Sequence, residues 1–150
     1  MTLKLADNKV LEPFRTEWIN ALRSNLYPQG CGKLRSDGPT TAYCCLGVGC
    51  EVAMKMGLLK LERSSGGYRN EEGYESTIFM PDNLAEIVFD AKMNSFFITK
   101  EMFDWINERS PEDTTALIHV RAGGLASFVT LNDSLHLTFP QIADFIETFL

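Results

Sequence analysis

The run from Tyr43 to Cys50 constrains the fold of this chain more than any other segment. It reads Tyr-Cys-Cys-Leu-Gly-Val-Gly-Cys and leads into a helix-like sequence that ends before Gly57, a suitable C-terminal cap. Cysteine supplies a small buried side chain or a reactive thiol, and each glycine inside a helix costs about 1 kcal/mol relative to alanine. We expect a helix from about residue 41 or 44 to 56. It is either a tightly packed helix junction or the wall of a site.

The length and composition predict one globular domain. The chain has 150 residues, of which 45% are apolar and 23% charged, so it is long enough to bury a core. No apolar run approaches the ~20 residues that span a bilayer, and residues 1–7 lack the apolar stretch of a signal peptide. We therefore expect a cytoplasmic protein with no membrane partner.

The four cysteines predict free thiols. Disulfides are rare in a reducing cytosol, and a zinc site usually requires closely spaced ligand pairs at two places in the chain. No such spacing exists among the cysteines and histidines, which are Cys31, Cys44, Cys45, Cys50, His119 and His136. We expect no metal and no cofactor.

Charge is unevenly distributed along the chain. Residues 1–60 hold eight Lys/Arg and five Asp/Glu, a balance of +3, and residues 61–150 hold six and fifteen, a balance of −9. These sum to the net charge of −6. Because duplex nucleic acid demands a basic face, it is excluded as a partner. The basic half can still bind a small anion, and the acidic half is either a solvated surface or a face for a basic protein.

Periodicity and capping signals predict the other elements. We expect a compact α+β domain, mainly α, of about five helices with a small β hairpin or sheet. Residues 28–42 are expected to form a loop or short hairpin, residues 60–77 a mobile polar loop or exposed hairpin with Tyr68 and Tyr74, and residues 78–80 a strand. For residues 110–131 a helix over 110–122 is preferred to a hairpin of 115–121 with 125–131. The remaining helices are expected at 13–25, from 81 or 82, from Thr99, and from the capping box of Thr138 and Gln141. The first and last helices are expected to pack around the cysteine–glycine helix.

Three separated segments together resemble a family of small proteins of tailed phages and prophages. The segments are Trp18-Ile19-Asn20-Ala21-Leu22-Arg23-Ser24 with Tyr27-Pro28-Gln29-Gly30, Tyr43-Cys44-Cys45-Leu46-Gly47-Val48, and Leu131-Asn132-Asp133-Ser134 with the run from Leu137 to Glu147. The resemblance covers both ends and the centre of the chain but not residues 60–125. It implies a phage accessory protein acting in bacterial cytoplasm, and it carries over no activity.

The loop from Gln29 to Arg35 is the candidate anion site. It lacks the spacing of a phosphate-binding P-loop, but a glycine-bearing turn with cations can form an anion nest. Lys33 offers a point charge, and Arg35 or Arg23 a planar fork for phosphate or carboxylate. The alternative is a solvated basic loop.

Polar and aromatic residues near the ends of the chain extend this candidate site. Asn132 and Asp133 form either a clamp on a ligand or a structural turn, and Trp18 and Tyr43 either stack a base or, for Trp18 at helical spacing, belong to the core. The predicted ligand-binding residues are Trp18, Arg23, Gln29, Lys33, Arg35, Tyr43, Cys44, Asn132 and Asp133.

Three functions follow from these features. The first is a counter-defence protein that sequesters a small anionic, nucleotide-like ligand without chemistry. The second is an inhibitor that binds a host protein through its acidic half. The third is an enzyme with Cys44 or Cys45 as nucleophile and His119 or His136 as base. A homo-oligomer is compatible with each of them.

Overall fold

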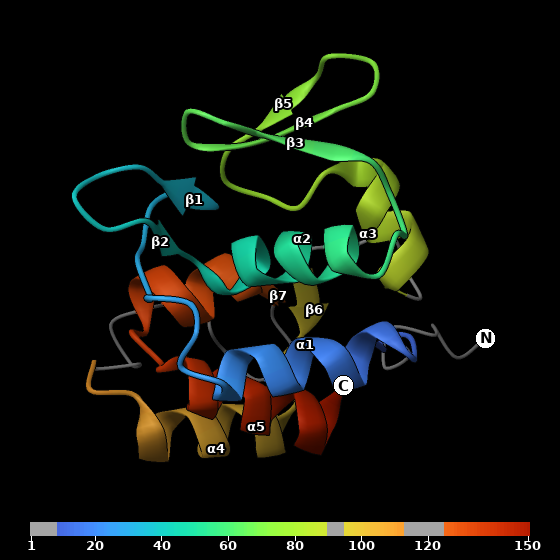
Figure 1. Cartoon of the computed structure of the whole chain (residues 1–150). Coiled ribbons are helices and arrows are strands. Elements are labelled where there is room, and N and C mark those ends of the chain that lie inside the picture. Colours follow the sequence, from blue (N-terminus) through green and yellow to red (C-terminus); the bar gives the residue numbers. More distant parts are fainter. Residues whose placement is uncertain (1–8, 90–94, 113–124) are drawn as a thin grey trace.

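Helices and three small antiparallel sheets form an α+β fold in the computed structural model, which describes residues 9–89, 95–112 and 125–150 (Figure 1). The α-helices of these residues are α1 (Phe14–Arg23), α2 (Cys45–Lys55), α3 (Asp82–Val88), α4 (Lys100–Arg109) and α5 (Phe139–Phe149), with a π-helical turn at Thr130–Ser134. The strands are β1 (Arg35–Ser36), β2 (Ala42–Tyr43), β3 (Leu61–Ser64), β4 (Gly67–Asn70), β5 (Glu75–Ser76), β6 (Ser95–Phe97) and β7 (Leu125–Ser127). The predicted fold class is confirmed at this level.

Helix α2 lies at the centre of the fold, as the cysteine–glycine segment predicts. Its residues from Cys45 to Ala53 are all buried. The sheet β3-β4-β5 lies on one side of α2, and α1 lies on the other with α5 beyond it (Figure 1). Helix α1 packs against both α2 and α5. The expected packing of the first helix on the cysteine–glycine helix is thus confirmed, whereas the last helix packs mainly on α1 instead.

Local signals account for the positions of the helices. Phe14, Trp18 and Leu22 recur every four residues and are all buried, which gives α1 one apolar face. Thr99 accepts a hydrogen bond from the Met102 backbone and caps α4, and the expected capping box of α5 is present. The predicted helices at 13–25, 81/82, 99 and 138 are therefore confirmed.

The segment 60–77 agrees with the hairpin alternative rather than with the predicted loop. It forms a three-stranded antiparallel sheet in the order β3-β4-β5, and Tyr68 is fully buried rather than exposed. The strand predicted for residues 78–80 is wrong, because these residues form a bend. Ile78 and Phe79 are both half exposed, and Met80 is buried where the chain turns into α3. The three side chains thus do not alternate between two faces as a strand requires.

The region 110–131 is described only at its ends, because residues 113–124 lie outside the described part. The helix preferred for 110–122 falls largely on those residues. Ser110 ends α4 as its C-cap. Leu125–Ser127 is a strand that pairs antiparallel with β6, and the π-helical turn follows it. The alternative prediction placed a strand at 125–131. The observed strand begins at the same residue but ends at Ser127.

One hydrophobic core runs through the described residues and includes side chains from the five α-helices. An aromatic cluster occupies its centre, where Trp18 and Phe96 both lie edge-on to Phe128, with ring centroids 5.1 and 5.2 Å away. In the described residues, no helix combines the length and the apolar character needed to cross a membrane.

Candidate functional site

The three segments that sequence analysis grouped together meet at the side chain of Asn132. This residue lies in the π-helical turn and is 2% exposed. Its Oδ1 accepts hydrogen bonds from the Cys45 backbone N–H (3.2 Å) and from Gln29 Nε2 (3.0 Å). Its Nδ2 donates to the Gly30 carbonyl (2.8 Å) and to Asp133 Oδ1 (2.7 Å). The amide is thus fully hydrogen-bonded, and the expected convergence of the segments is confirmed.

Gln29 and Asp133 use their remaining polar atoms in the same way. Gln29 Nε2 also donates to the Leu137 carbonyl (2.9 Å), and its Oε1 accepts from the Phe139 backbone N–H (3.1 Å) at the start of α5. Asp133 Oδ2 accepts from the Gly32 backbone N–H (2.9 Å). These bonds join the loop after α1 to the turn before α5. Asn132 and Asp133 thus have the contacts expected of a structural turn.

A pocket of about 320 Å³ adjoins this network, and Gln29 and Asn132 belong to its wall. The other lining residues are Gly30, Cys31, His136, Leu137 and Thr138. Lys33 and Arg35, the expected anion ligands, do not line it. The structure therefore brings the predicted polar residues together but leaves the predicted cations of the loop outside their pocket.

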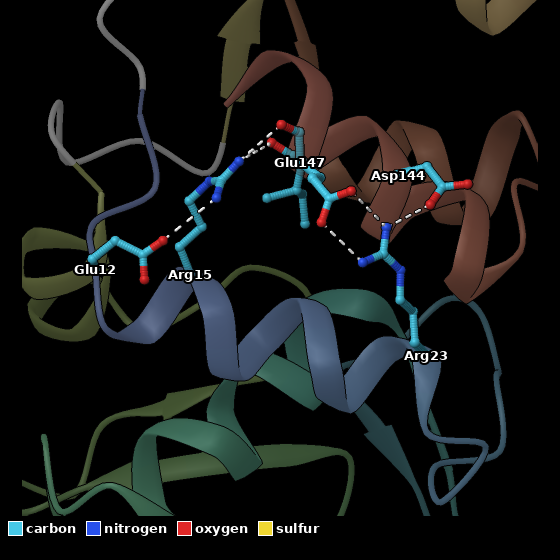
Figure 2. A network of polar contacts seen from close by, with 6 residues as sticks. Glu12, Arg15, Arg23, Asp144 and Glu147 are labelled. Atoms are coloured by element: carbon cyan, nitrogen blue, oxygen red, sulfur yellow. Dashed lines mark hydrogen bonds and ion pairs between the residues drawn. The ribbon is translucent and has the colours of Figure 1, made fainter.

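Arg23 lies at the interface of α1 and α5 (Figure 2). Its guanidinium contacts the carboxylates of Asp144 (2.6 Å) and Glu147 (3.0 Å), and Arg15 on the same helix donates to the Ile146 and Glu147 carbonyls at the end of α5. The fork that sequence analysis assigned to a phosphate is thus occupied by two carboxylates of the chain itself.

We expect the Arg23 pairs to make stability depend on pH. The hydrogen bonds and charge of Arg23 hold the pKa of Glu147 below its ordinary value. A carboxylate with a lowered pKa in the folded state contributes stability above its unfolded pKa of about 4.3 and loses it as the pH falls through the folded pKa. Arg23→Gln should therefore lower Tm at pH 7, by no more than a few degrees because the pair is exposed. The two proteins should converge near pH 3, measured by thermal unfolding monitored by circular dichroism.

Arg69→Gln is the matched control for this prediction, because Arg69 is an exposed arginine on β4. The difference in Tm between Arg69→Gln and the wild type should not change with the titration of Glu147. A Tm difference for Arg23→Gln that persists unchanged at pH 3 would contradict the assignment to this carboxylate.

The other predicted cations have different surroundings. Arg35 Nη1 contacts Asp37 (2.8 Å), and its side chain is mostly buried. Lys33 extends past the turn between β3 and β4, where its side chain would lie against a methyl group placed on Gly66. Lys33 remains the cation of this loop that is best placed to meet a solvent-borne anion, because it is exposed.

The aromatic candidates lie in the interior and at its margin. Trp18 has no exposed surface, and its Nε1 donates to the Cys45 carbonyl (3.0 Å). Tyr43 is half-buried and lies edge-on to Tyr27 with ring centroids 5.3 Å apart. The environment of Trp18 agrees with the core reading and offers no face on which a base can stack.

The thiols of α2 lack the environment of a nucleophile. Cys44, Cys45 and Cys50 are buried, and burial raises the pKa of all three, that of Cys44 to about 11. A reactive cysteine needs a thiolate near neutral pH. Within the described residues no cluster of three or more His, Cys, Asp or Glu side chains is arranged to hold a metal ion.

This burial predicts the thiol reactivity of the folded protein. Cys31 is the exposed cysteine, so we expect one thiol to react promptly with iodoacetamide at pH 7.5 and the other three to react only after unfolding in guanidinium chloride. Intact-mass spectrometry counts the adducts, and Cys31→Ser should show none in the folded state. Rapid labelling of Cys44 or Cys45 in folded protein would contradict the burial of these thiols and would favour an enzyme with one of them as nucleophile.

A groove of about 590 Å³ that the sequence patterns did not predict lies beside β5 and the start of α3. We call it the acidic groove. Three of the exposed large hydrophobic residues line it: Tyr74 (69% exposed), Phe79 (50%) and Ile78 (46%). Its other lining residues are Asn70, Glu72, Glu75, Ser76, Thr77, Met80, Pro81, Asp82 and Asn83.

Buried polar contacts hold the sheet above α2 and so shape this groove. Glu51 of α2 is 4% exposed and accepts a hydrogen bond from the Tyr68 hydroxyl (2.7 Å) and two from the Arg63 guanidinium (2.7 and 3.1 Å). At the other end the Leu34 backbone N–H donates to the Thr77 carbonyl (2.6 Å). The walls of the acidic groove are thus anchored to the core at both ends.

One signal in the sequence points to the groove in retrospect. Ile78 and Phe79 are adjacent apolar residues flanked by acidic ones, among them Glu75 and Asp82. An exposed apolar patch with a charged rim is typical of an interaction surface. The signal was missed because the apolar pair was assigned to a short strand over residues 78–80.

Comparison with known proteins identifies the family of the chain. The family model described as "Domain of unknown function (DUF8296)" matches residues 12–150. The chain belongs to the DUF8296 family. No curated protein and no solved structure matches it. The match covers both the Asn132 network and the acidic groove, so both are parts of the family domain.

Proposed function

We propose that this DUF8296 protein acts by binding another protein, without chemistry of its own, and that a basic segment of that protein occupies the acidic groove. The observation that carries the proposal is the pairing of exposed apolar side chains with carboxylates in one groove. Tyr74, Ile78 and Phe79 offer apolar area, and aromatic residues are enriched at binding hot spots.

Charge supports a basic partner. Glu72, Glu75 and Asp82 line the groove, and residues 61–150 carry a balance of −9 from six Lys/Arg and fifteen Asp/Glu. Complementary charge steers the encounter of two proteins and rejects acidic competitors. The resemblance to phage proteins suggests that the partner is a protein of the bacterial host, which the binding would inhibit.

The thiols support the absence of chemistry. The three cysteines of α2 are buried with raised pKa values, so they are poor nucleophiles near neutral pH. Cys31 is exposed and shares a pocket wall with His136, but no hydrogen bond joins these two described side chains. A binding role needs none of these groups.

Photo-crosslinking in bacterial cells tests this proposal. Benzoylphenylalanine is placed at Ile78 in the groove or, as a matched control, at Leu26, an exposed apolar residue away from it. We expect one host protein to be crosslinked from position 78 and not from position 26. After purification, that protein should bind the wild type and lose at least about tenfold in affinity to a triple variant with lysine at positions 72, 75 and 82.

A second triple variant controls for net charge. Lysine replaces Glu17, Glu101 and Glu108, which are exposed acids outside the groove, and the partner should still bind. Equal crosslinking from positions 78 and 26, or equal affinity of the two triple variants, would overturn the proposal.

A second candidate function is the sequestration of a small anionic, nucleotide-like ligand in the pocket beside Gln29 and Asn132. One observation favours it: this pocket includes Thr138 at the N-terminus of α5, where the helix dipole attracts negative charge. Native mass spectrometry of protein purified from bacteria with active nucleotide-signalling immunity tests it. An added mass of several hundred daltons, lost in a His136→Glu variant that places a negative charge in the wall of this pocket, is the expected result. The mass of the bare chain would contradict tight capture.

A further inference from the structure

Strand β5 lies at the edge of its sheet, beside the acidic groove. The strand order is β3-β4-β5, and β5 pairs only with β4 within this sheet. An edge strand presents unpaired main-chain groups to which another chain can add a strand. The free side of β5 therefore decides how a segment could bind there.

The register shows which main-chain groups point to that free side. The Asn70 backbone N–H donates to the Tyr74 carbonyl (2.9 Å), and Arg69 lies opposite Glu75. In an antiparallel ladder hydrogen-bonded and non-hydrogen-bonded pairs alternate. The pair of Arg69 and Glu75 is consequently of the non-hydrogen-bonded kind, and the N–H and C=O of Glu75 point away from β4.

The next outward-facing residue on the same side already accepts a main-chain hydrogen bond. The Thr77 carbonyl receives the N–H of Leu34, a residue from a different part of the chain. The backbone at Leu34 therefore closes this side of the strand at Thr77 and leaves the N–H and C=O of Glu75 as the main-chain groups that a second chain can reach. Towards the other end, a methyl group placed on Gly73 would meet open space, so the approach to Glu75 is clear there.

We infer that the partner segment binds as an added β-strand, with its main chain hydrogen-bonded to Glu75 and its basic and apolar side chains alternating over the acidic groove. This inference rests on the proposed function and specifies the conformation of the bound segment. Successive side chains of a strand point to opposite faces. One face of the added strand therefore meets Glu72, Tyr74 and the start of α3, and carboxylates on that face select lysine or arginine.

A synthetic peptide of alternating lysine and valine, acetylated and amidated, tests the inference on the full chain. Amide hydrogen exchange followed by NMR is measured with and without saturating peptide. We expect exchange at the Glu75 amide to slow at least about tenfold. The matched control is Arg63, whose N–H points outward from β3, the opposite edge of the sheet, by the same alternation. Its exchange should not change.

Two further measurements separate strand addition from simple occupation of the groove. Peptides N-methylated on all lysines or on all valines remove opposite sets of main-chain donors, so one of them should lose binding and the other keep it. Glu75→Pro removes the outward N–H at an edge position that tolerates proline, whereas Glu75→Gln removes only the charge. We expect the proline variant to bind the peptide at least about tenfold more weakly than the glutamine variant.

Several results would overturn the added strand. These are an absence of peptide binding at millimolar concentration, binding without slower exchange at Glu75, and equal binding of both N-methylated peptides. If Glu75→Pro does not fold, the N-methylated peptides still decide. The proposed function would survive each of these results if the host protein still crosslinks from position 78. That crosslink should be lost in the variant with lysine at positions 72, 75 and 82.

Discussion

Gly47→Ala is expected to destabilise the protein by about 3 kcal/mol, although alanine is the better helix former by about 1 kcal/mol. A methyl group on Gly47 would overlap the main-chain carbonyl of Leu34. That carbonyl accepts the Cys44 backbone N–H (3.2 Å), the first contact before α2 begins. Because the obstacle is backbone rather than a flexible side chain, α2 or the segment before β1 must move.

Urea unfolding and thermal unfolding measure this effect. For a chain of this length about 3 kcal/mol corresponds to a fall in Tm of roughly 6 to 12 °C. Gly38→Ala is the matched control, since a methyl group there would make only an ordinary contact with the Thr40 carbonyl (3.6 Å). Gly49→Ala should fall between the two, because the closest atom is the mobile end of Met80 (2.9 Å). A Gly47→Ala protein as stable as the wild type would show that the close approach of α2 to Leu34 is wrong.

Asn132→Ala is expected to cost about 3 kcal/mol, because one amide satisfies four polar groups. Its removal leaves the Cys45 N–H and the Gly30 carbonyl without their partner and frees one donor of Gln29. A buried donor or acceptor left unpaired costs about 1 to 3 kcal/mol. Water entering from the adjoining pocket would recover part of this loss.

Denaturant unfolding of three variants separates the contributions. Asn132→Asp keeps the acceptor for Cys45 but removes the donor to Gly30 and places a second carboxylate beside Asp133, so it should also be unstable at pH 7. Asn20→Ala, on the exposed face of α1, should change stability by no more than about 0.5 kcal/mol. An Asn132→Ala protein that unfolds at the wild-type denaturant concentration would contradict the network and remove the link between the three family segments.

These two positions also show how far sequence patterns reach. Glycine at 47 was recognised as costly in a helix and therefore as a sign of close packing or binding, and packing against Leu34 is the reason that the structure supplies. Asn132 was recognised as polar and turn-forming, but its partners lie 87 and 103 residues away at Cys45 and Gln29. Local sequence patterns span only a few residues, so they cannot predict contacts between residues so far apart in the chain.

The candidate sites divide in the same way. Gln29 was singled out because it belongs to a glycine-bearing basic loop, and Asn132 because it belongs to a polar, turn-forming run. The structure brings both residues to one pocket. The acidic groove was missed, since Tyr74, Phe79 and Asp82 meet only when the β4–β5 turn folds back towards α3. Two of its exposed apolar residues, Ile78 and Phe79, were assigned to a short strand from the sequence.

Sequence patterns were sufficient to predict α1 from its apolar face and α5 from its capping box and apolar face, because helical hydrogen bonds join residues only four positions apart. The sequence by itself also determined the acidic character of the second half of the chain. Only the tertiary structure decided that Tyr68 and Glu51 would share a buried hydrogen bond, that Asn132 would join three distant segments, and that β5 would leave Glu75 on a free edge. Each of these depends on how separate elements pack, and packing is set by contacts between residues far apart in the chain.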